Sequence, residues 1–142
     1  MMIRQAKQEE TREIVDIWLE ASRLAHDFIP YEFWGSRAGE METIYLPSAE
    51  NYVVESEGEL AGFLSLADNY LAALFIRPTQ QGRGYGRQLL DFAKSRRDSL
   101  TLCVYAKNSR AVKFYQAAGF QIVEERMEPL AGESEMVMEW NG

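Results

Sequence analysis

The sequence predicts one mixed α/β (α+β) domain over residues 1–142, with helices on both faces of a central sheet. The length of 142 residues suits a single domain. Apolar residues make up 46% and charged residues 26%, which is typical of a globular chain. The expected segment order is β-α-α-β-β-β-α-β-α-β-β, with about seven strands and about four helices. Because only the middle of this order alternates, it favours a mixed sheet over a doubly wound parallel one.

The first part of the chain predicts a short strand followed by helices. Residues 3–6 form the expected strand, and residues 9–27 follow with apolar side chains at helical spacing. The apolar stripe of this helix is Ile14, Ile17, Trp18, Ala21, Leu24, Ala25 and Phe28. Pro30 ends the helix, and residues 31–45 predict a second helix that Gly35 and Gly39 weaken.

The middle and the end of the chain predict six further strands and two further helices. Turn residues at 57–58 and 68–69 separate three strands, which end at residues 56, 67 and 76. A helix follows the glycine-rich residues 80–86, and a strand is expected at 100–105. Asn108 or Ser109 caps the next helix, and Gly119 ends it. Residues 121–127 and 135–140 form the last two strands.

The composition excludes several classes of protein. One cysteine, Cys103, and one histidine, His26, rule out a disulfide framework and make a metal site unexpected. The net charge of -7 argues against a nucleic-acid partner. However, residues 77–113 hold nine basic and two acidic residues, a window of +7 in a remainder of -14. This window predicts a polyanion site, although a solvated helix face explains the charges equally well. Without a signal peptide or membrane span, we expect a cytoplasmic protein.

The glycine-rich segment from Gln80 to Arg87 predicts a phosphate cradle. A strand enters it and a helix begins inside it, so unpaired backbone N–H groups can bind an anion. Glycines let the ligand approach the backbone, and Arg83 and Arg87 add positive charge. A P-loop would need Lys-Ser/Thr where Arg87-Gln88 stand. A dinucleotide fold would need an acidic residue near position 105, where none stands.

Two motifs resemble the GNAT superfamily of N-acetyltransferases. One is Gln81-x-x-Gly84-x-Gly86 after a strand that ends in Ile76-Arg-Pro, and the other runs from Asn108 through Ala111 to Phe114-Tyr115-x-x-x-Gly-Phe. Small bacterial members are also similar at residues 25–29 and 71–75. The resemblance covers nearly the whole chain. It implies the acyl-CoA N-acyltransferase fold, with a mostly antiparallel sheet.

The resemblance also implies acetyl-CoA as co-substrate and assigns its contacts. The backbone of Leu74, Phe75 and Ile76 would bind the pantetheine arm. The pyrophosphate would contact Gln81, Gly82, Arg83, Gly84, Tyr85, Gly86 and Arg87, and Asn108 would contact the pantetheine or adenosine end. Tyr115 would be the general acid, because a phenol of pKa near 10 can protonate a thiolate of similar basicity. The alternative for Tyr115 is a packing role.

The general base is open at the level of sequence. Many members of the superfamily have a glutamate on the strand before Asn108, where this chain has Cys103. Cys103 itself suits a buried filler better than a nucleophile, since no histidine lies near it in sequence. His26 can titrate near neutrality and is a second candidate catalytic residue, with packing as the alternative. Glu32, Asp68 and a water wire are further alternatives.

The sequence therefore predicts transfer of an acetyl group from acetyl-CoA to a primary amine by direct attack in a ternary complex. The acidic remainder of the chain favours a cationic acceptor, and relatives of this small type imply a protein lysine. Alternatives are a small-molecule amine, a non-catalytic acetyl-CoA sensor, or an unrelated nucleotide-binding module. No nucleic acid or membrane partner is expected, and the chain is expected as a monomer or homodimer.

Overall fold

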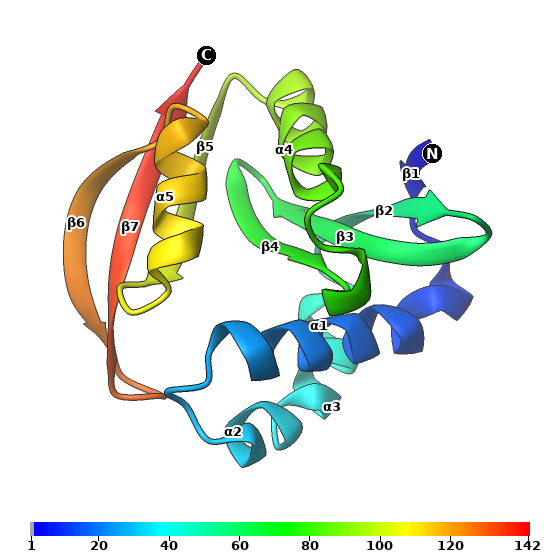
Figure 1. The fold of residues 1–142 in the computed structure, drawn as a ribbon, viewed down its shortest axis with the longest axis horizontal. Helices are drawn as coiled ribbons and strands as arrows, with labels where there is room; N and C mark the ends of the chain where they lie inside the picture. Colours follow the sequence, from blue (N-terminus) through cyan, green and yellow to red (C-terminus); the bar gives the residue numbers. More distant parts are fainter. Residues whose placement is uncertain (1) are drawn as a thin grey trace.

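A computed structural model describes residues 2–142 as one seven-stranded sheet with helices on both faces (Figure 1). The strand order is β1-β2-β3-β4-β5-β7-β6. Neighbouring strands are antiparallel except β4 and β5, which are parallel. The predicted mixed, mostly antiparallel sheet is therefore confirmed. The strands are β1 (Met2–Gln5), β2 (Glu50–Ser56), β3 (Glu59–Ala67), β4 (Tyr70–Ile76), β5 (Ser99–Tyr105), β6 (Gln121–Glu128) and β7 (Glu133–Asn141).

Three regular helices lie close to where the sequence places them. They are α1 (Thr11–Ala25), α4 (Tyr85–Arg96) and α5 (Ser109–Ala117). A 3-10 turn, η1 (Gln8–Glu10), leads into α1, and another, η3 (Pro78–Gln80), precedes the glycine-rich turn. Gly119 has φ +96°, as expected for the glycine that ends α5.

The predicted second helix over residues 31–45 is broken into three short segments. These are α2 (Tyr31–Gly35), α3 (Ala38–Glu40) and a π-helical turn, η2 (Met41–Tyr45). Gly35 and Gly39 lie at or beside the breaks, where glycine favours departure from the helix. Trp34 and Met41 are nevertheless buried, so this region still covers the core.

Helix α1 packs on one face of the sheet through Ile14, Ile17, Trp18 and Ala21. These side chains meet Val53, Phe63 and Ala73 of the central strands. The prediction that Leu24 continues the buried stripe is wrong, because its side chain is 63% exposed. It lies in the last turn of α1 and lines a cavity instead of the core.

Helices α4 and α5 cover the opposite face. Leu89, Leu90 and Ala93 of α4 are fully buried against residues of β3 and β5. From α5, Tyr115 joins the same cluster. The two helices thus stand side by side on this face, as Figure 1 shows.

Strands β4 and β5 meet only at their beginnings. The single register pair between them is Tyr70 with Thr101, and the Thr101 N–H donates to the Asn69 carbonyl at 3.0 Å. Beyond this point the strands run apart (Figure 1). The end of β4, from Leu74 to Ile76, therefore has β3 on one side and no strand partner on the other. Separately, no helix within residues 2–142 combines the length and apolarity needed to cross a membrane.

Candidate functional site

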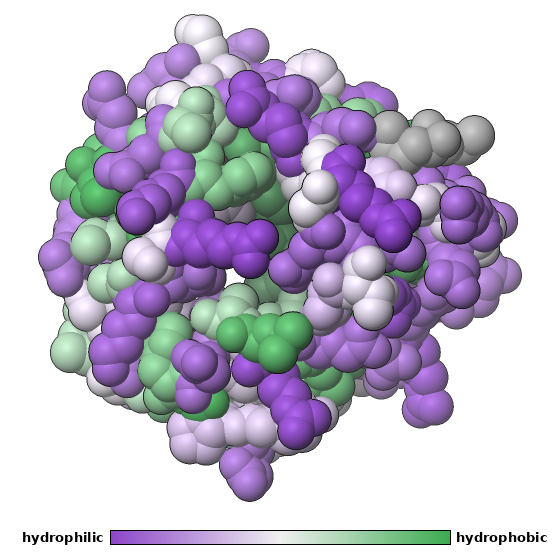
Figure 2. Space-filling model, viewed as in Figure 1, coloured by the Kyte–Doolittle hydropathy of each residue, from purple (hydrophilic) through white to green (hydrophobic). Residues whose placement is uncertain are grey.

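A cavity of about 640 Å³ opens where β4 and β5 separate. Figure 2 shows this face hollowed near its middle, with apolar side chains in the depth and hydrophilic ones around the rim. Four segments line the cavity. They are the last turns of α1 with residues 27–28, the end of β4 (residues 74–76), the glycine-rich turn with the start of α4 (residues 80–87), and the start of α5 (residues 107–115).

The glycine-rich turn brings backbone N–H groups to the cavity. Gly82 and Gly84 have φ +81° and +86°, a conformation that other residues rarely adopt, and Gly84 is the N-cap of α4. No heavy atom lies within 4 Å of a Cβ placed on Gly82. The N–H groups of residues 85–87 have no carbonyl partner inside the helix. The turn is therefore open to a ligand that accepts hydrogen bonds.

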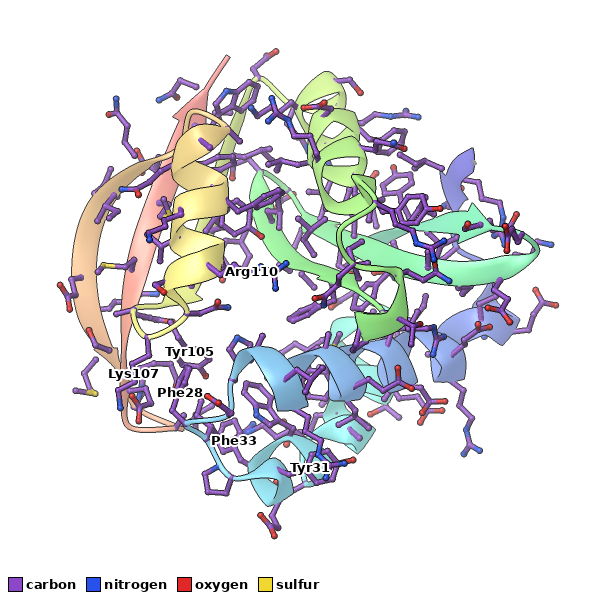
Figure 3. All side chains as sticks on the ribbon, viewed as in Figure 1. Phe28, Tyr31, Phe33, Tyr105, Lys107 and Arg110 are labelled. Carbon is purple, nitrogen blue, oxygen red and sulfur yellow. The ribbon has the colours of Figure 1, made fainter. Side chains whose placement is uncertain are left out.

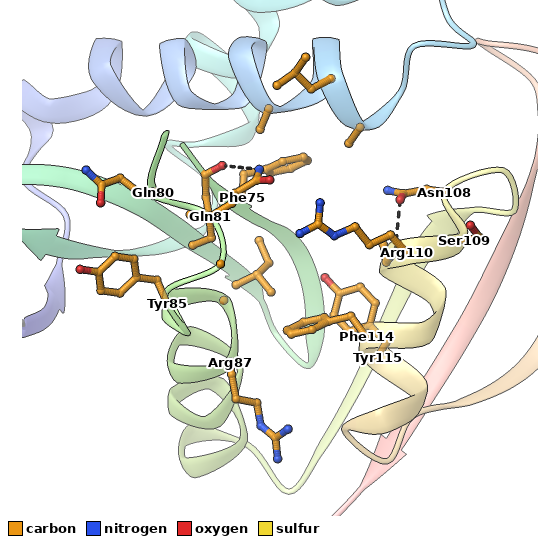
Figure 4. Close-up of a pocket in the computed structure, with 18 of the residues that line it drawn as sticks. Phe75, Gln80, Gln81, Tyr85, Arg87, Asn108, Ser109, Arg110, Phe114 and Tyr115 are labelled. Atoms are coloured by element: carbon orange, nitrogen blue, oxygen red, sulfur yellow. Dashed lines mark hydrogen bonds between the residues drawn. The ribbon is translucent and has the colours of Figure 1, made fainter. Parts of the chain in front are cut away.

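Side chains on both flanks hold this turn in place. The Gln81 side-chain amide donates to the Ile76 carbonyl at 3.1 Å, which ties the turn to the end of β4 (Figure 4). The Tyr85 hydroxyl lies 2.6 Å from the Ser56 hydroxyl of β2. Tyr85 thus serves the cavity through its backbone, while its hydroxyl anchors the helix to the sheet.

The two helices that begin at the cavity have an unusual charge pattern. α1, α2 and α3 each have a glutamate in the first turn, where the helix dipole favours negative charge. α4 and α5 have no acidic residue there. Arg87 and Arg110 occupy those turns instead, and both line the cavity. Two positive helix ends and two guanidinium groups therefore face the same space.

The basic window predicted from the sequence is only partly a cavity surface. Arg87, Lys107 and Arg110 line the cavity. By contrast, Arg77 pairs with Glu20 of α1 at 3.3 Å and Arg97 pairs with Glu50 of β2. The Lys94 ammonium donates to the Ala118 carbonyl, and the Arg96 guanidinium lies over the Phe92 ring. The interpretation of the whole window as one anion site is therefore wrong for these four residues. The partners of Arg77, Lys94 and Arg97 come from distant segments, which the charge count did not consider.

Tyr115 lies on the α5 wall of the cavity with Phe114 beside it (Figure 4). Its side chain is 8% exposed, and its ring packs on Phe120 at a centroid distance of 5.5 Å. Burial raises the pKa of the Tyr115 hydroxyl above its usual value, because the phenolate would be poorly solvated. The hydroxyl therefore keeps its proton at neutral pH and faces the cavity as a donor.

Asn108 and His26 connect the start of α5 to the end of α1. The Asn108 Oδ1 accepts the Ala111 N–H at 3.3 Å, which caps α5, and its Nδ2 lies 3.4 Å from His26 Nε2. His26 is 7% exposed and does not line the cavity. Burial lowers the pKa of His26 to about 4, so the imidazole is neutral at pH 7. Its Nδ1 is buried with no hydrogen-bond partner among residues 2–142.

Aromatic rings surround His26 at the α1 end of the cavity. The ring centroids of Trp34 and Tyr105 lie 5.1 Å from that of His26, and that of Phe28 lies 5.9 Å away. Figure 3 shows Phe28, Tyr105 and Lys107 gathered where α1 ends. The Lys107 ammonium lies over the Phe28 ring at 5.6 Å and pairs with Glu133 at 3.1 Å.

The structure separates the predicted site residues into two groups. Those that line the cavity are Leu74, Phe75, Ile76, Gln81, Gly82, Gly84, Tyr85, Gly86, Arg87, Asn108 and Tyr115. Arg83 and His26 lie beside it without lining it, and Glu32, Asp68 and Cys103 are not part of its wall either. Arg126 of β6 donates a hydrogen bond to the Cys103 thiol at 3.4 Å.

Sequence reasoning assigned no site role to three charged residues of the wall, Asp27, Lys107 and Arg110, although the last two lie in the predicted basic window. Asp27 is the one carboxylate among the lining residues that the structure describes. Its segment, residues 25–29, is similar to small bacterial members of the family, but that similarity assigned no role to Asp27. Arg110 had a detectable signal, because it is a cation two residues after the N-cap Asn108, where the helix dipole disfavours positive charge.

Comparison with known proteins identifies the family to which this chain is similar. Residues 47–122 match the model of the acetyltransferase (GNAT) domain. The chain is 40% identical over 124 residues to the peptidyl-lysine N-acetyltransferase YiaC of Escherichia coli, covering 87% of this chain and 85% of the relative. It is 35% identical to YjaB of the same organism, also described as a peptidyl-lysine N-acetyltransferase, over 84% of this chain and 82% of YjaB.

Solved structures reproduce the fold over almost the whole chain. The solution structure of apo YjaB from E. coli superposes with a TM-score of 0.86 at 30% identity, covering 99% of this chain and 97% of YjaB. The PaiA N-acetyltransferase of Thermoplasma acidophilum, solved in complex with coenzyme A, has a TM-score of 0.81 at 18% identity, covering 99% and 98%.

Proposed function

Because the chain belongs to the GNAT family of acetyltransferases, we propose that it transfers an acetyl group from acetyl-CoA to a primary amine, first of all a lysine side chain of a protein. The observation that carries this proposal is the cavity between β4 and β5. It joins open helix N-termini at one end to a protonated, buried tyrosine, Tyr115. The lysine acceptor is proposed because YiaC and YjaB are described as peptidyl-lysine N-acetyltransferases.

The residues of the cavity fit coenzyme A. The N–H groups of residues 85–87 and the open turn at Gly82 and Gly84 suit a diphosphate. The free edge of β4 at Leu74–Ile76 offers backbone groups to the amides of a pantetheine arm, as an added strand would use them. Asn108 lies across from this edge at the start of α5. When bound, acetyl-CoA supplies the acetyl thioester and a thiolate leaving group.

Tyr115 is proposed as the general acid. Its raised pKa keeps the proton on the hydroxyl at neutral pH, and a thiolate that forms beside it in the same buried surroundings is made more basic by the same loss of solvation. A departing thiolate takes this proton, and the proton that the amine nitrogen loses as the amide forms returns to Tyr115, so that neither a thiolate nor a buried phenolate remains. A non-catalytic acetyl-CoA sensor would have no need of a hydroxyl at this wall, so the placement of Tyr115 supports catalysis.

We assign His26 a positioning role rather than that of a proton acceptor. A pKa of about 4 makes its imidazole a weak base at neutral pH. As a neutral ring it can accept the Asn108 amide N–H at Nε2, which holds the capping residue of α5 and thereby the helix that carries Tyr115. Direct attack by the amine is proposed because Cys103 lies outside the cavity wall and cannot carry the acetyl group there.

Asp27 is proposed to attract the acceptor. It lines the wall at the α1 end, next in sequence to Phe28, whose ring centroid lies 5.7 Å from that of Tyr105. An ammonium group would be drawn to this carboxylate, and its proton can pass from there to solvent before attack. The Phe28 side chain, which also lines the cavity, can contact the methylene groups of a lysine side chain.

The experiment that tests the proposed function uses isotope-labelled acetyl-CoA with a panel of acceptors. Peptides containing lysine, peptides with a free N-terminal amine only, polyamines and amino sugars are compared by release of free thiol and by mass spectrometry. We expect labelled acetyl on the lysine Nζ of the peptides. Thiol release only with small amines would contradict the lysine acceptor, and binding of acetyl-CoA without transfer to any amine would favour the sensor.

A further inference from the structure

Arg110 extends from the first turn of α5 into the cavity. Figure 4 shows its guanidinium reaching from the α5 side toward Gln81 and the glycine-rich turn. It lines the cavity together with Gln81, Gly82 and Gly84. Within residues 2–142, its side chain has no hydrogen bond, ion pair or ring contact. The guanidinium is therefore free to bind a ligand from the side opposite α4.

Most other arginines of the chain are committed to protein partners. Arg87, the other arginine of the cavity wall, pairs with Asp91 at 3.2 Å. Arg77 pairs with two glutamates of α1, and Arg126 pairs with Glu135. Arg83 also lacks a partner in the described part of the chain, but it does not line the cavity. Of the two arginines that line the cavity, Arg110 is therefore the one whose guanidinium has no protein partner among residues 2–142.

The position of Arg110 is unfavourable for the protein alone. The first turn of α5 carries the positive end of the helix dipole, and no acidic residue lies there to offset it. A cation in this turn repels that positive end unless an anion lies between them. The same arrangement recurs at α4, where Arg87 occupies the first turn. The first turns of α4 and α5 thus both combine a positive helix end with an arginine, which is the arrangement expected if one anion binds between the two helices.

We propose that Arg110 is a specificity-determining residue that binds the diphosphate of the acetyl donor from the α5 side and closes the cradle that Gly82–Gly86 begin. The inference rests on the proposed function and deepens it, because it names the part of the donor that is selected. A planar guanidinium binds phosphate oxygens through two parallel N–H donors. Acetyl thioesters that lack the diphosphate would lose this contact and would be poor donors.

The test compares four ligands that shorten the coenzyme step by step: coenzyme A, 3′-dephospho-coenzyme A, 4′-phosphopantetheine and pantetheine. Their affinities for the wild-type chain, Arg110→Gln and Lys113→Gln are measured by calorimetry. Lys113 is exposed, lies one turn further along α5 and does not line the cavity, so Lys113→Gln is the matched loss of one charge. Arg110→Gln is expected to fold at least as stably as the wild type, because it removes a cation from a positive helix end.

We expect Arg110→Gln to weaken binding of coenzyme A and of its dephospho form by about 10- to 100-fold, as for one charged hydrogen-bonded contact. Pantetheine binding and all affinities of Lys113→Gln should change less than about threefold. Equal loss for pantetheine, or no loss for any ligand, would overturn the inference. Loss for coenzyme A alone would also overturn it, because the contact would then be with the 3′-phosphate and not with the diphosphate. A wild-type chain that bound none of the four would instead overturn the proposed function.

Discussion

Gly84 connects the backbone of the glycine-rich turn to both stability and binding. Its φ of +86° and its place as N-cap of α4 make it sensitive to any side chain. A Cβ there would meet only the Gln88 side chain, at 3.9 Å, so steric clash is not the cost. The left-handed backbone costs a non-glycine residue about 1–2 kcal/mol. Gly84→Ala should therefore lower the unfolding temperature by roughly 5 °C.

Gly84→Asp adds a negative charge to the same backbone strain. At roughly 5 Å and an effective dielectric constant of about 20, a carboxylate and one unit of phosphate charge repel by about 3 kcal/mol. This corresponds to about a 100-fold loss of affinity beyond that of Gly84→Ala. The comparison of the two variants therefore separates charge from strain.

The assay is calorimetric titration of both variants with coenzyme A, at a temperature where each is fully folded by circular dichroism. Gly84→Ala should bind more weakly than the wild type, because its methyl group enters the space beside the turn where the diphosphate is proposed to lie. Equal affinity of Gly84→Asp and Gly84→Ala would refute the reasoning, since the diphosphate would then lie away from this turn.

Three further predictions concern charge and pH. Burial lowers the pKa of His26 to about 4, so on acidification the unfolded chain takes up this proton at a higher pH than the folded chain. The wild type should therefore lose about 3 kcal/mol of stability as the pH falls from 6.5 to 4. His26→Gln should lack this slope in denaturant titrations, and an identical slope would contradict the burial argument. Asp27→Asn should raise the KM for a lysine peptide about fivefold and leave that for acetyl-CoA unchanged, whereas Glu32→Gln, an acid outside the cavity wall, should change neither. Arg4 holds the pKa of Glu10 at about 2, so Glu10→Gln should cost about 2 kcal/mol at pH 7. That cost should vanish as the pH falls from 4.5 toward 2, and a constant cost would exclude the ion pair as its source.

The elements that local patterns specify were predictable from the sequence. Turn residues at Glu57-Gly58 and the cap at Asn108 depend on neighbours a few positions away, and both lie where expected. Leu24 shows the limit of periodicity, which identifies an apolar stripe but not where the sheet beneath it ends. In residues 31–45, Trp34 and Met41 are buried although the regular helix is broken. The aromatic and apolar side chains determine the burial, whereas Gly35 and Gly39 favour the breaks.

The candidate site was predictable where its residues act through a motif. The glycine-rich turn and Asn108 are short patterns with a defined backbone role, and the structure brings both to one cavity. Asp27 and Arg110 join that cavity through the packing of α1 and α5 around the open end of the sheet. No local pattern reports such packing for Asp27, and for Arg110 the only local sign is a cation in the first turn of a helix. For the same reason, charge counting could not assign Arg77 to Glu20, which lies 57 residues away.

The most direct test of the account is the turnover of Tyr115→Phe against its affinity for coenzyme A. The variant keeps the ring that packs on Phe120 and removes only the hydroxyl. We predict that kcat falls at least about 100-fold while the affinity stays within twofold of the wild type. Tyr52→Phe, which alters a buried tyrosine outside the cavity wall, should retain full turnover. Unchanged turnover of Tyr115→Phe, or a loss of affinity as large as the loss of turnover, would contradict a proton-donating role for Tyr115.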